Sequence, residues 1–529
     1  ADLNTIDTNS NNNVVATAAT TLTGTAAAIK TAIEAGTIDT ATNVAVSVNS
    51  GTVTVAQLKA INAATTGAIV LSDTSGALSA SASDLVSALA GTVTDYTGNV
   101  TVTNSVNISQ LKAINDAVSG TITLDDTSGA LYGTASDLFD ALTGITNYSG
   151  VIIITDEPTV TQLKTINDAA SSSITLNDTN GALSGTASDL VDAFAGTVTE
   201  HEGSVTVTDA ATIAQLTTID AATTGTMIYT SMTDSASNLA GNVGSYVSGS
   251  VNITVTGATV SAADLNTIDG LTGGTVTATA ATAITGTAAA IATALSATTI
   301  DHAAATITAT VDAGSVAAAD LNTIDTNSNN NVVATAATTL TGTAAAIKTA
   351  IEAGTIDTAT NVAVSVNSGT ASVSQLADID NATTGIITAT ATEGDMATLA
   401  SLTNDNSNNA ITVTVTDASV AAGALNTLDG KTSANVTATA VTAITGTAAA
   451  IATALSATTI DHAAATITAT VDAGSVAAAD LNTIDTNSNN NVVATAATTL
   501  TGTAAAIKTA IEAGTIDTAT NVAVSVNSG

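Results

Sequence analysis

The chain has 529 residues, a formal net charge of −37 and no cysteine. All seven of its basic residues are lysines, too few cations to neutralise a phosphate backbone, so nucleic-acid binding is excluded. The absence of cysteine excludes disulfides and thiolate metal sites. Hydrophobic residues make up 45% of the chain and aromatic residues 1%, so a core must be built from Ala, Val, Ile and Leu. Polar residues interrupt every apolar stretch before about 18 residues, and we expect no transmembrane segment.

The chain opens on a segment that recurs unchanged. Residues 1–51, 319–369 and 479–529 are identical, and the last two copies begin 160 residues apart. Identity at a fixed spacing is typical of repeat architectures. We expect one continuous solenoid over residues 1–529, with a 160-residue super-repeat best seen at 319–478 and its next copy starting at 479. Because the sequence starts and stops inside a repeat, we expect it to be a fragment of a longer array.

The first segment also contains a candidate metal site. In DTNSNNN, Asp7, Asn9 and Asn11 stand at alternate positions, as in the D-x-N-x-N opening of a calcium loop, where oxygen ligands converge on a hard cation. The two other copies repeat the motif at Asp325, Asn327 and Asn329 and at Asp485, Asn487 and Asn489. The place of a closing glutamate is taken by Ala18, and an Asn-rich segment is also typical of a plain turn. Calcium is the one cofactor that the sequence indicates.

Two kinds of coil alternate further along the chain, as in residues 204–225 and 121–144. Each begins with a short alternating run rich in Val, Ile and Thr, which predicts a half-buried strand. We expect the alternate aliphatic residues to point inward and the intervening threonines outward. The inward pairs are Val100 and Val102, Ile122 and Leu124, and Val205 and Val207.

A capped helix follows each strand. Thr54 and Gln57, Thr159 and Gln162, and Thr212 and Gln215 have the spacing of a capping box. Ser81 and Asp84, Thr134 and Asp137, and Thr186 and Asp189 have the same spacing in the other kind of coil. The helices are expected to end at TTG, LAG or LTG, where glycine would supply the left-handed residue of a C-cap.

A coil of strand and capped helix is too small to bury its own apolar face, so coils must stack. The sequence therefore predicts an α/β solenoid, with short parallel strands on one side and short capped helices on the other. An all-β parallel solenoid is the alternative, favoured by Thr-rich stretches such as TATAATAITGT.

The residues that could carry chemistry are few. His302 and His462 are one residue in two copies of TTIDHAAA, and His201 is the third histidine. These, and carboxylate pairs such as Asp125 and Asp126 or Glu200 and Glu202, are interpreted as turn and loop residues, because no partner for nucleophilic or metal catalysis accompanies them. Outward threonines could also form an ice-binding array, although threonine is simply a good strand former. We expect no enzyme.

The segments TVAQLKAINAATTG, TITLDDTSGALYGTASDLFDALTG and VTVTDAATIAQLTTIDAATTG resemble the giant Thr/Ala-rich repeat proteins of bacterial cell surfaces, cyanobacterial ones among them. The resemblance covers nearly the whole chain and implies a surface-layer, filament or adhesin role. The GGxGxD nonapeptides of secreted calcium β-rolls are missing.

Together these features predict an extracellular or cell-surface structural protein of a filament or surface layer, built by stacking of coils and self-associating head to tail, laterally or both. The alternative is the stalk of a large secreted adhesin. An enzyme of the parallel β-helix type would need clustered carboxylates or basic groups on one face, which the sequence lacks.

Overall fold

The computed structural model describes residues 1–90, 95–302, 307–328, 330–403, 408–462, 467–488 and 490–527. Contacts divide the chain into two compact units. Unit 1 consists of Ala1–Asp234 with Gly241–Thr254, and unit 2 of Ser235–Ala240 with Val255–Gly529. The expected continuity of one solenoid across this boundary stays a prediction.

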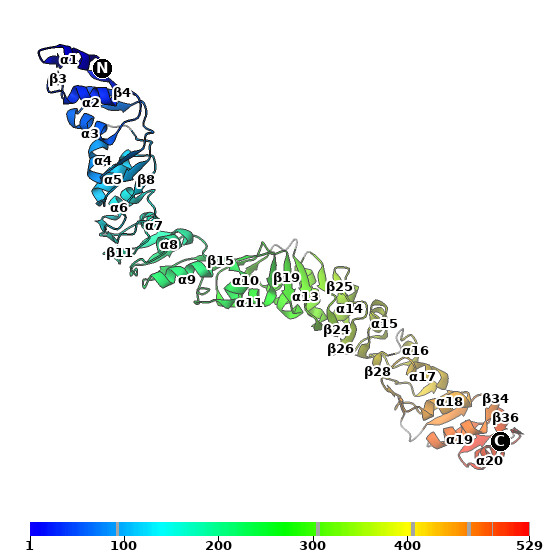
Figure 1. The fold of residues 1–529 in the computed structure, drawn as a ribbon. Coiled ribbons are helices and arrows are strands. Elements are labelled where there is room, and N and C mark those ends of the chain that lie inside the picture. Colours follow the sequence, from blue (N-terminus) through cyan, green and yellow to red (C-terminus); the bar gives the residue numbers. More distant parts are fainter. Residues whose placement is uncertain are drawn as a thin grey trace. The chain divides into compact units, whose positions relative to one another are not determined.

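Short helices and strands alternate along unit 1 (Figure 1). Its helices are α1 (Asp2–Asn9), α2 (Ala26–Glu34), α3 (Val55–Ala64), α4 (Ala82–Leu89), α5 (Ile108–Ala117), α6 (Ala135–Leu142), α7 (Val160–Ala169), α8 (Ala187–Ala193) and α9 (Ile213–Ala222). Its strands are β1 (Val14–Ala16), β2 (Thr21–Thr25), β3 (Ile38–Thr40), β4 (Ala45–Ser50), β5 (Ile69–Leu71), β6 (Leu78–Ala80), β7 (Val100–Val102), β8 (Ile122–Leu124), β9 (Leu131–Gly133), β10 (Ile152–Ile154), β11 (Ile174–Leu176), β12 (Leu183–Gly185), β13 (Val205–Val207) and β14 (Met227–Ile228). Residues of both units occur in β15 (Ser231–Ser235), α10 (Ala236–Gly241) and β16 (Asn252–Thr256).

Unit 2 repeats the same alternation. Its helices are α11 (Ala262–Leu271), α12 (Ala288–Ser296), α13 (Ala318–Asn327), α14 (Ala344–Glu352), α15 (Val373–Ala382), α16 (Met396–Leu399), α17 (Ala422–Asp429), α18 (Ala448–Ser456), α19 (Ala478–Asn487) and α20 (Ala504–Glu512). Its strands are β17 (Thr259–Ser261), β18 (Val276–Thr277), β19 (Ala283–Gly286), β20 (Ile300–Asp301), β21 (Thr308–Val311), β22 (Gly314–Ala317), β23 (Val332–Ala334), β24 (Ala337–Gly342), β25 (Ile356–Thr358), β26 (Ala363–Val366), β27 (Ile387–Thr390), β28 (Ala410–Thr414), β29 (Ser419–Ala421), β30 (Val436–Thr437), β31 (Ala443–Gly446), β32 (Ile460–Asp461), β33 (Thr468–Val471), β34 (Gly474–Ala477), β35 (Val492–Ala494), β36 (Ala497–Gly502), β37 (Ile516–Thr518) and β38 (Ala523–Val526).

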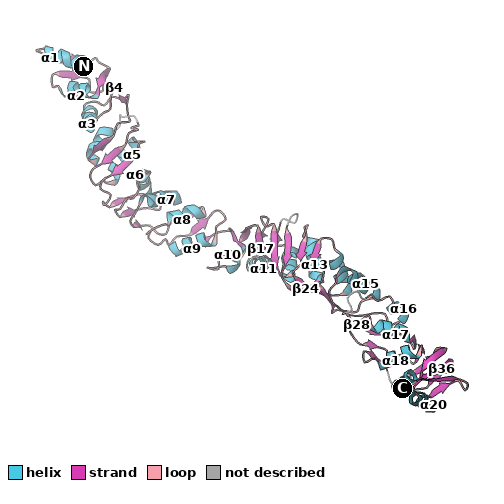
Figure 2. Cartoon of the chain, turned by 45° about the vertical axis from the view of Figure 1, so that its right-hand side comes forward, coloured by secondary structure: helices cyan, strands magenta, loops and turns pink. Residues whose placement is uncertain are grey.

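Each helix packs on the next within a unit, from α1 to α9 in unit 1 and from α11 to α15 and α16 to α20 in unit 2. Strands of successive coils pair side by side, as in the sheets β6-β7-β8 and β17-β19-β21-β23-β25 (Figure 2). In the first of these sheets Leu78 pairs with Val100 and Val100 with Ile122, a step of 22 residues. Every strand pairing found among the described residues is parallel. The α/β solenoid is confirmed, and the all-β alternative is wrong.

Strand alternation places the core as predicted. Val100, Val102 and Val205 are fully buried and Val207 nearly so, with the intervening Thr101 and Thr206 half-exposed. In β8 the pattern is weaker, since its two aliphatic residues are themselves only half-buried. The helices supply the opposite wall with Leu, Ile and Ala, such as Leu111 and Ile114 of α5.

The predicted capping boxes are present at Thr54, Thr159 and Thr212. The hydroxyls of Ser81, Thr134 and Thr186 also accept from the expected backbone amides. There the aspartate accepts a hydrogen bond from the capping hydroxyl instead of completing the box.

The prediction for the helix ends is half right. Gly144 of LTG has φ +79°, as a left-handed residue should. The TTG glycines Gly67 and Gly225 do not, and the C-caps Thr65 and Thr223 before them are extended. Of the two LAG glycines, Gly91 lies outside the described residues, and Gly241, at the end of α10, is not left-handed. The TTG glycines instead allow the backbone of the neighbouring coil to approach closely.

In the part of the chain that the structure describes, no helix combines the length and the apolar character needed to cross a bilayer.

Candidate functional site

The candidate calcium residues lie at the end of a helix. Asp7 and Asn9 belong to the last turn of α1, and Asn11 follows in an exposed bend. Residues two apart on a helix point in different directions, so Asp7 and Asn9 do not converge. The amide Nδ2 of Asn9 donates instead to the carbonyl of Thr5 at 2.7 Å.

The other copies behave alike. Asp325 and Asn327 end α13, Asp485 and Asn487 end α19, and Asn329 and Asn489 lie outside the described residues. A carboxylate oxygen of Asp485 accepts a hydrogen bond from the Thr515 hydroxyl. Within the described ranges, no three His, Cys, Asp or Glu side chains gather as a metal site. Calcium binding stays a prediction, and it requires the last helical turn to rearrange.

The two carboxylate pairs, Asp125 with Asp126 and Glu200 with Glu202, lie outside the helices and strands, and Asp126 has a clear structural role. Asp126 accepts hydrogen bonds from the amide and the hydroxyl of Ser128, which lower the pKa of its carboxyl. Asp73 holds Ser75 in the same way, with the same effect on its pKa. A carboxylate held in its ionised form by two donors is a turn-forming group rather than a general acid.

His201 is buried, with 2% of its surface exposed, and its ring lies 6.0 Å from that of Phe194 at a tilt of 45°. It occupies the position of Tyr96 and Tyr148, which precede Gly98 and Gly150 by two residues as His201 precedes Gly203. The tyrosine hydroxyls donate to the carbonyls of Gly76 and Gly129 at 2.6 and 2.7 Å. Neither ring nitrogen of His201 makes a hydrogen bond of ordinary geometry. Burial lowers the pKa of its imidazole, and the nearby carbonyl of Gly181 offsets only part of this effect.

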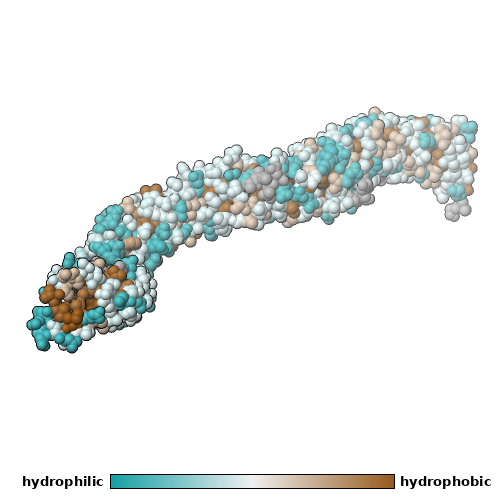
Figure 3. Space-filling model, turned by 90° about the horizontal axis from the view of Figure 1, so that it is seen from above, coloured by the Kyte–Doolittle hydropathy of each residue, from teal (hydrophilic) through white to brown (hydrophobic). Residues whose placement is uncertain are grey.

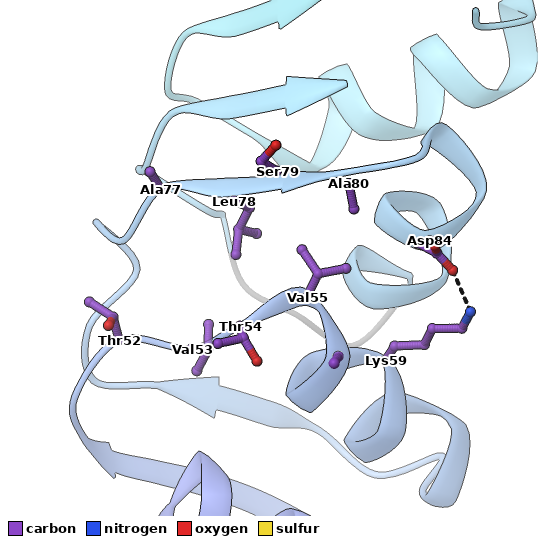
Figure 4. A pocket seen from close by; sticks show the side chains of 11 residues that line it. Thr52, Val53, Thr54, Val55, Lys59, Ala77, Leu78, Ser79, Ala80 and Asp84 are labelled. Carbon is purple, nitrogen blue, oxygen red and sulfur yellow. Dashed lines mark hydrogen bonds and ion pairs between the residues drawn. The ribbon is translucent and has the colours of Figure 1, made fainter. Parts of the chain in front are cut away.

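One cavity of about 660 Å³ opens between α3 and β6 (Figure 4). Aliphatic side chains, among them Val53, Val55 and Leu78, and the hydroxyl of Thr54 line it. At its edge Lys59 and Asp84 form an ion pair, so their charges largely cancel. The residues that line this cavity include no nucleophile paired with a base and no cluster of like charges. A catalytic site needs at least one of these.

The most regular chemistry of the chain lies between coils. In alternate helices an asparagine, directly after either the core Leu or the core Ile of its helix, donates its side-chain amide to a backbone carbonyl of the next helix, at 2.6 to 3.0 Å. The pairs are Asn4 to Ala28, Asn62 to Ser87, Asn115 to Asp140, Asn167 to Asp192, Asn266 to Ala290, Asn322 to Ala346, Asn426 to Ala450 and Asn482 to Ala506. We call these bonds the asparagine staples.

Helix N-termini are also capped from the next coil. The first amide of α6 donates to the Asp156 carboxylate at 2.7 Å, and that of α8 to Asp209 at 2.7 Å. Further cross-coil caps are Asn104 on Ala82, Asp234 on Ile213, Glu393 on Val373 and Asp417 on Met396. A carboxylate at a helix N-terminus is favourable, so these acidic side chains hold one coil to the next.

Ion pairs add to the same contacts. Lys112 pairs with Asp140, Lys164 with Asp192, and Lys348 with Asp378 at 2.8 Å, each from one helix to the next. The pairing with Asp140 raises the pKa of Lys112. These side chains are partly exposed, and such pairs contribute little stability each, but they fix the register of neighbouring helices.

Glycine columns set how closely the coils approach. A Cβ added at Gly98 would lie 2.1 Å from the carbonyl oxygen of Gly76, and one at Gly120 would lie 2.3 Å from that of Gly98. The column of Gly181, Gly203 and Gly225 has the same geometry, at 2.0 and 1.8 Å. Only glycine allows backbones this close, which is the purpose of the TTG glycines.

Sequence reasoning missed the staples, the cross-coil caps and the glycine columns. The staples had a signal, since each asparagine either ends an LKAIN or LKTIN motif or is the second residue of an LNTID or LNTLD motif. The glycine columns had a weaker sequence signal, which is the 22-residue spacing of glycines. A spacing alone does not reveal which backbone lies opposite each glycine.

No protein-family description, curated protein or solved structure matches this chain.

Proposed function

We propose that this chain is a structural protein, the building material of an extracellular filament or surface layer. The observation that supports the proposal most is the direction of its polar side chains. Asparagines, aspartates and lysines at fixed places of the coil bind the backbone or the side chains of the next coil. Such residues in an enzyme would instead converge on a cavity.

The identical repeats support the same conclusion. A catalytic site needs to occur once in a chain, whereas residues 1–51 are repeated without change at 319–369 and 479–529. A building block gains from repetition, because each copy adds the same length and the same faces. In this proposal the chain has no enzymatic activity, and its partners are further copies of itself.

Charge controls assembly in this proposal. At −37, neighbouring chains repel one another unless salt or divalent cations screen them. Calcium is the natural candidate outside the cell, whether it binds at Asp7 and its equivalents or only screens the acidic surface.

Electron microscopy of the native material, labelled with antibodies against the repeat, tests the function. We expect the label along continuous fibres or over a regular lattice. Label confined to the base of isolated projections would contradict the proposal and favour an adhesin stalk. Label inside cells would contradict the extracellular location.

A further inference from the structure

The contact between the coils of α8 and α9 contains a histidine where the equivalent contacts contain a tyrosine. His201 is 2% exposed and stands at the place of Tyr96 and Tyr148. Each tyrosine hydroxyl donates to a glycine carbonyl of the preceding coil, at 2.6 and 2.7 Å, whereas neither ring nitrogen of His201 makes a hydrogen bond of ordinary geometry. Because a buried polar group without such a bond is costly, this contact is held less firmly than its equivalents.

Two other residues change together with the histidine. Glu157 and Glu202 both stand where the equivalent coils have a threonine or a serine. The equivalent residues are Thr52 and Ser105 for Glu157, and Thr97 and Ser149 for Glu202. The contact with histidine therefore has carboxylates at two places where the contacts with tyrosine have hydroxyls.

Three carboxylates are close enough to act on the charge of the imidazole, those of Glu157, Asp178 and Glu202. They come from the segment before α7, from the segment between β11 and β12, and from the residue next to the histidine, and all three residues are exposed. The other neighbours are uncharged: α8 is followed by the ring of Phe194, and the next coil contributes the hydroxyl of Thr223. The charged groups that face the ring are therefore all negative and all lie at the surface.

The backbone beside the ring is bonded to the coils on both sides. The carbonyl of His201 accepts from the amide of Thr224 in the next coil at 2.8 Å. Toward the preceding coil, the amides of Glu202 and Gly203 donate to the carbonyl of Thr179 at 2.8 and 2.9 Å. With the backbone held in this way and the ring buried, the ring reaches water only when the preceding coil moves away.

We propose that the contact between these two coils is an acid-opened joint. In the closed state His201 is buried and uncharged. When it takes up a proton, the charged ring leaves the interior and pairs with Glu157, Asp178 and Glu202 at the surface, and β12 separates from β13. The equivalent contacts stay closed, because a tyrosine hydroxyl carries no charge in this range of pH. This joint would act whatever larger structure the chain forms.

The direction of the switch follows from burial. Burial lowers the pKa of the His201 imidazole in the closed state, and the carbonyl of Gly181 and the three carboxylates offset only part of this effect. The open state takes up its proton at the ordinary pKa of 6.5, so the contact is most stable above this pH and is lost as the pH falls further. Below it, the opening constant should rise about tenfold per pH unit. Exposed surroundings suit the charged ring, since hydrophilic and intermediate residues form most of the face drawn in Figure 3.

Native-state hydrogen exchange of the 529-residue chain, between about pH 7.5 and pH 5 and corrected for the intrinsic pH dependence of exchange, tests the proposal. The amide of Leu183, which donates to Ser204 across the joint at 2.9 Å, should lose protection below about pH 6.5. The equivalent amides of Leu78 and Leu131 should keep theirs. Protection of Leu183 that does not change with pH would overturn the joint.

Two reciprocal variants identify the group that titrates. His201→Tyr should keep the joint closed at every pH in this range. Tyr148→His should create the same acid opening between β9 and β10, whatever its effect at neutral pH. An acid opening that persists in His201→Tyr would assign the switch to the carboxylates and overturn the role of the histidine, and so would a Tyr148→His chain whose protection is independent of pH.

The carboxylates have a test of their own. Glu157→Thr combined with Glu202→Ser restores the residues of equivalent coils and leaves the histidine in place. Because the charged ring then loses two of its partners, opening should begin at lower pH than in the wild type. An unchanged onset would overturn the part assigned to these two residues.

Discussion

The glycine columns give the sharpest prediction about stability. Replacing Gly150 by alanine would place a Cβ 1.8 Å from the carbonyl oxygen of Gly129, where ordinary contacts begin at 3.4 Å. The Cβ is fixed to its own backbone and the oxygen is a backbone atom of the next coil, so neither can turn away and the coils must separate. Separation strains two bonds across the same contact, Gly150 N to Thr127 O at 2.7 Å and Tyr148 Oη to Gly129 O at 2.7 Å.

Overpacking costs about 1–3 kcal/mol, and weakening two buried hydrogen bonds adds about 1 kcal/mol each. We therefore expect Gly150→Ala to destabilise its coil by about 3–5 kcal/mol. Gly36→Ala is the matched control, since nothing lies within 4 Å of its added Cβ. It should be neutral or stabilise by about 0.5 kcal/mol through the unfolded state.

Native-state hydrogen exchange is the suitable assay, because repeat arrays open locally and need not unfold in one step. Amides of β9 and β10 should lose protection in Gly150→Ala and keep it in Gly36→Ala. If Gly150→Ala lowers the local free energy of opening of β9 and β10 by less than about 0.5 kcal/mol, the close approach of the coils is refuted.

Three further predictions concern single side chains and bound ions. Because burial lowers the pKa of His201 in the folded chain, the unfolded chain binds the extra proton first, and stability falls as pH drops below about 6.5. His201→Tyr, which restores the residue of the equivalent coils, should remove that fall in pH-dependent melting; an unchanged slope would contradict the argument. Asn167→Ala removes the staple to Asp192, 2.7 Å long, and should cost about 1 kcal/mol in exchange protection of α8, whereas no loss would make the staple incidental. If Asp7, Asn9 and their copies bind calcium, chelation lowers the melting temperature, and identical curves with and without chelator would end that prediction.

The sequence could predict the features that depend only on neighbouring residues in the chain. The alternation of Val205, Thr206 and Val207 and the capping box of Thr212 involve residues within a few positions, so their physics is contained in the segment. These predictions were confirmed. The half-burial of Ile122 in β8 was missed because the position of β8 at the end of the sheet β6-β7-β8 depends on pairing between coils.

Contacts between coils were harder to predict. A glycine such as Gly225 has the same sequence surroundings as a C-cap glycine, and only the carbonyl of Gly203 opposite explains it. The calcium motif has a similar difficulty, because D-x-N-x-N does not reveal that α1 extends through Asp7 to Asn9.

The central claim is that this chain builds a larger structure from itself. Light scattering of the purified chain, over a range of concentrations with and without calcium or magnesium, tests it most directly. We predict growth to species larger than dimers once salt or divalent cations screen the charge of −37. A strictly monomeric chain under all these conditions would contradict the claim.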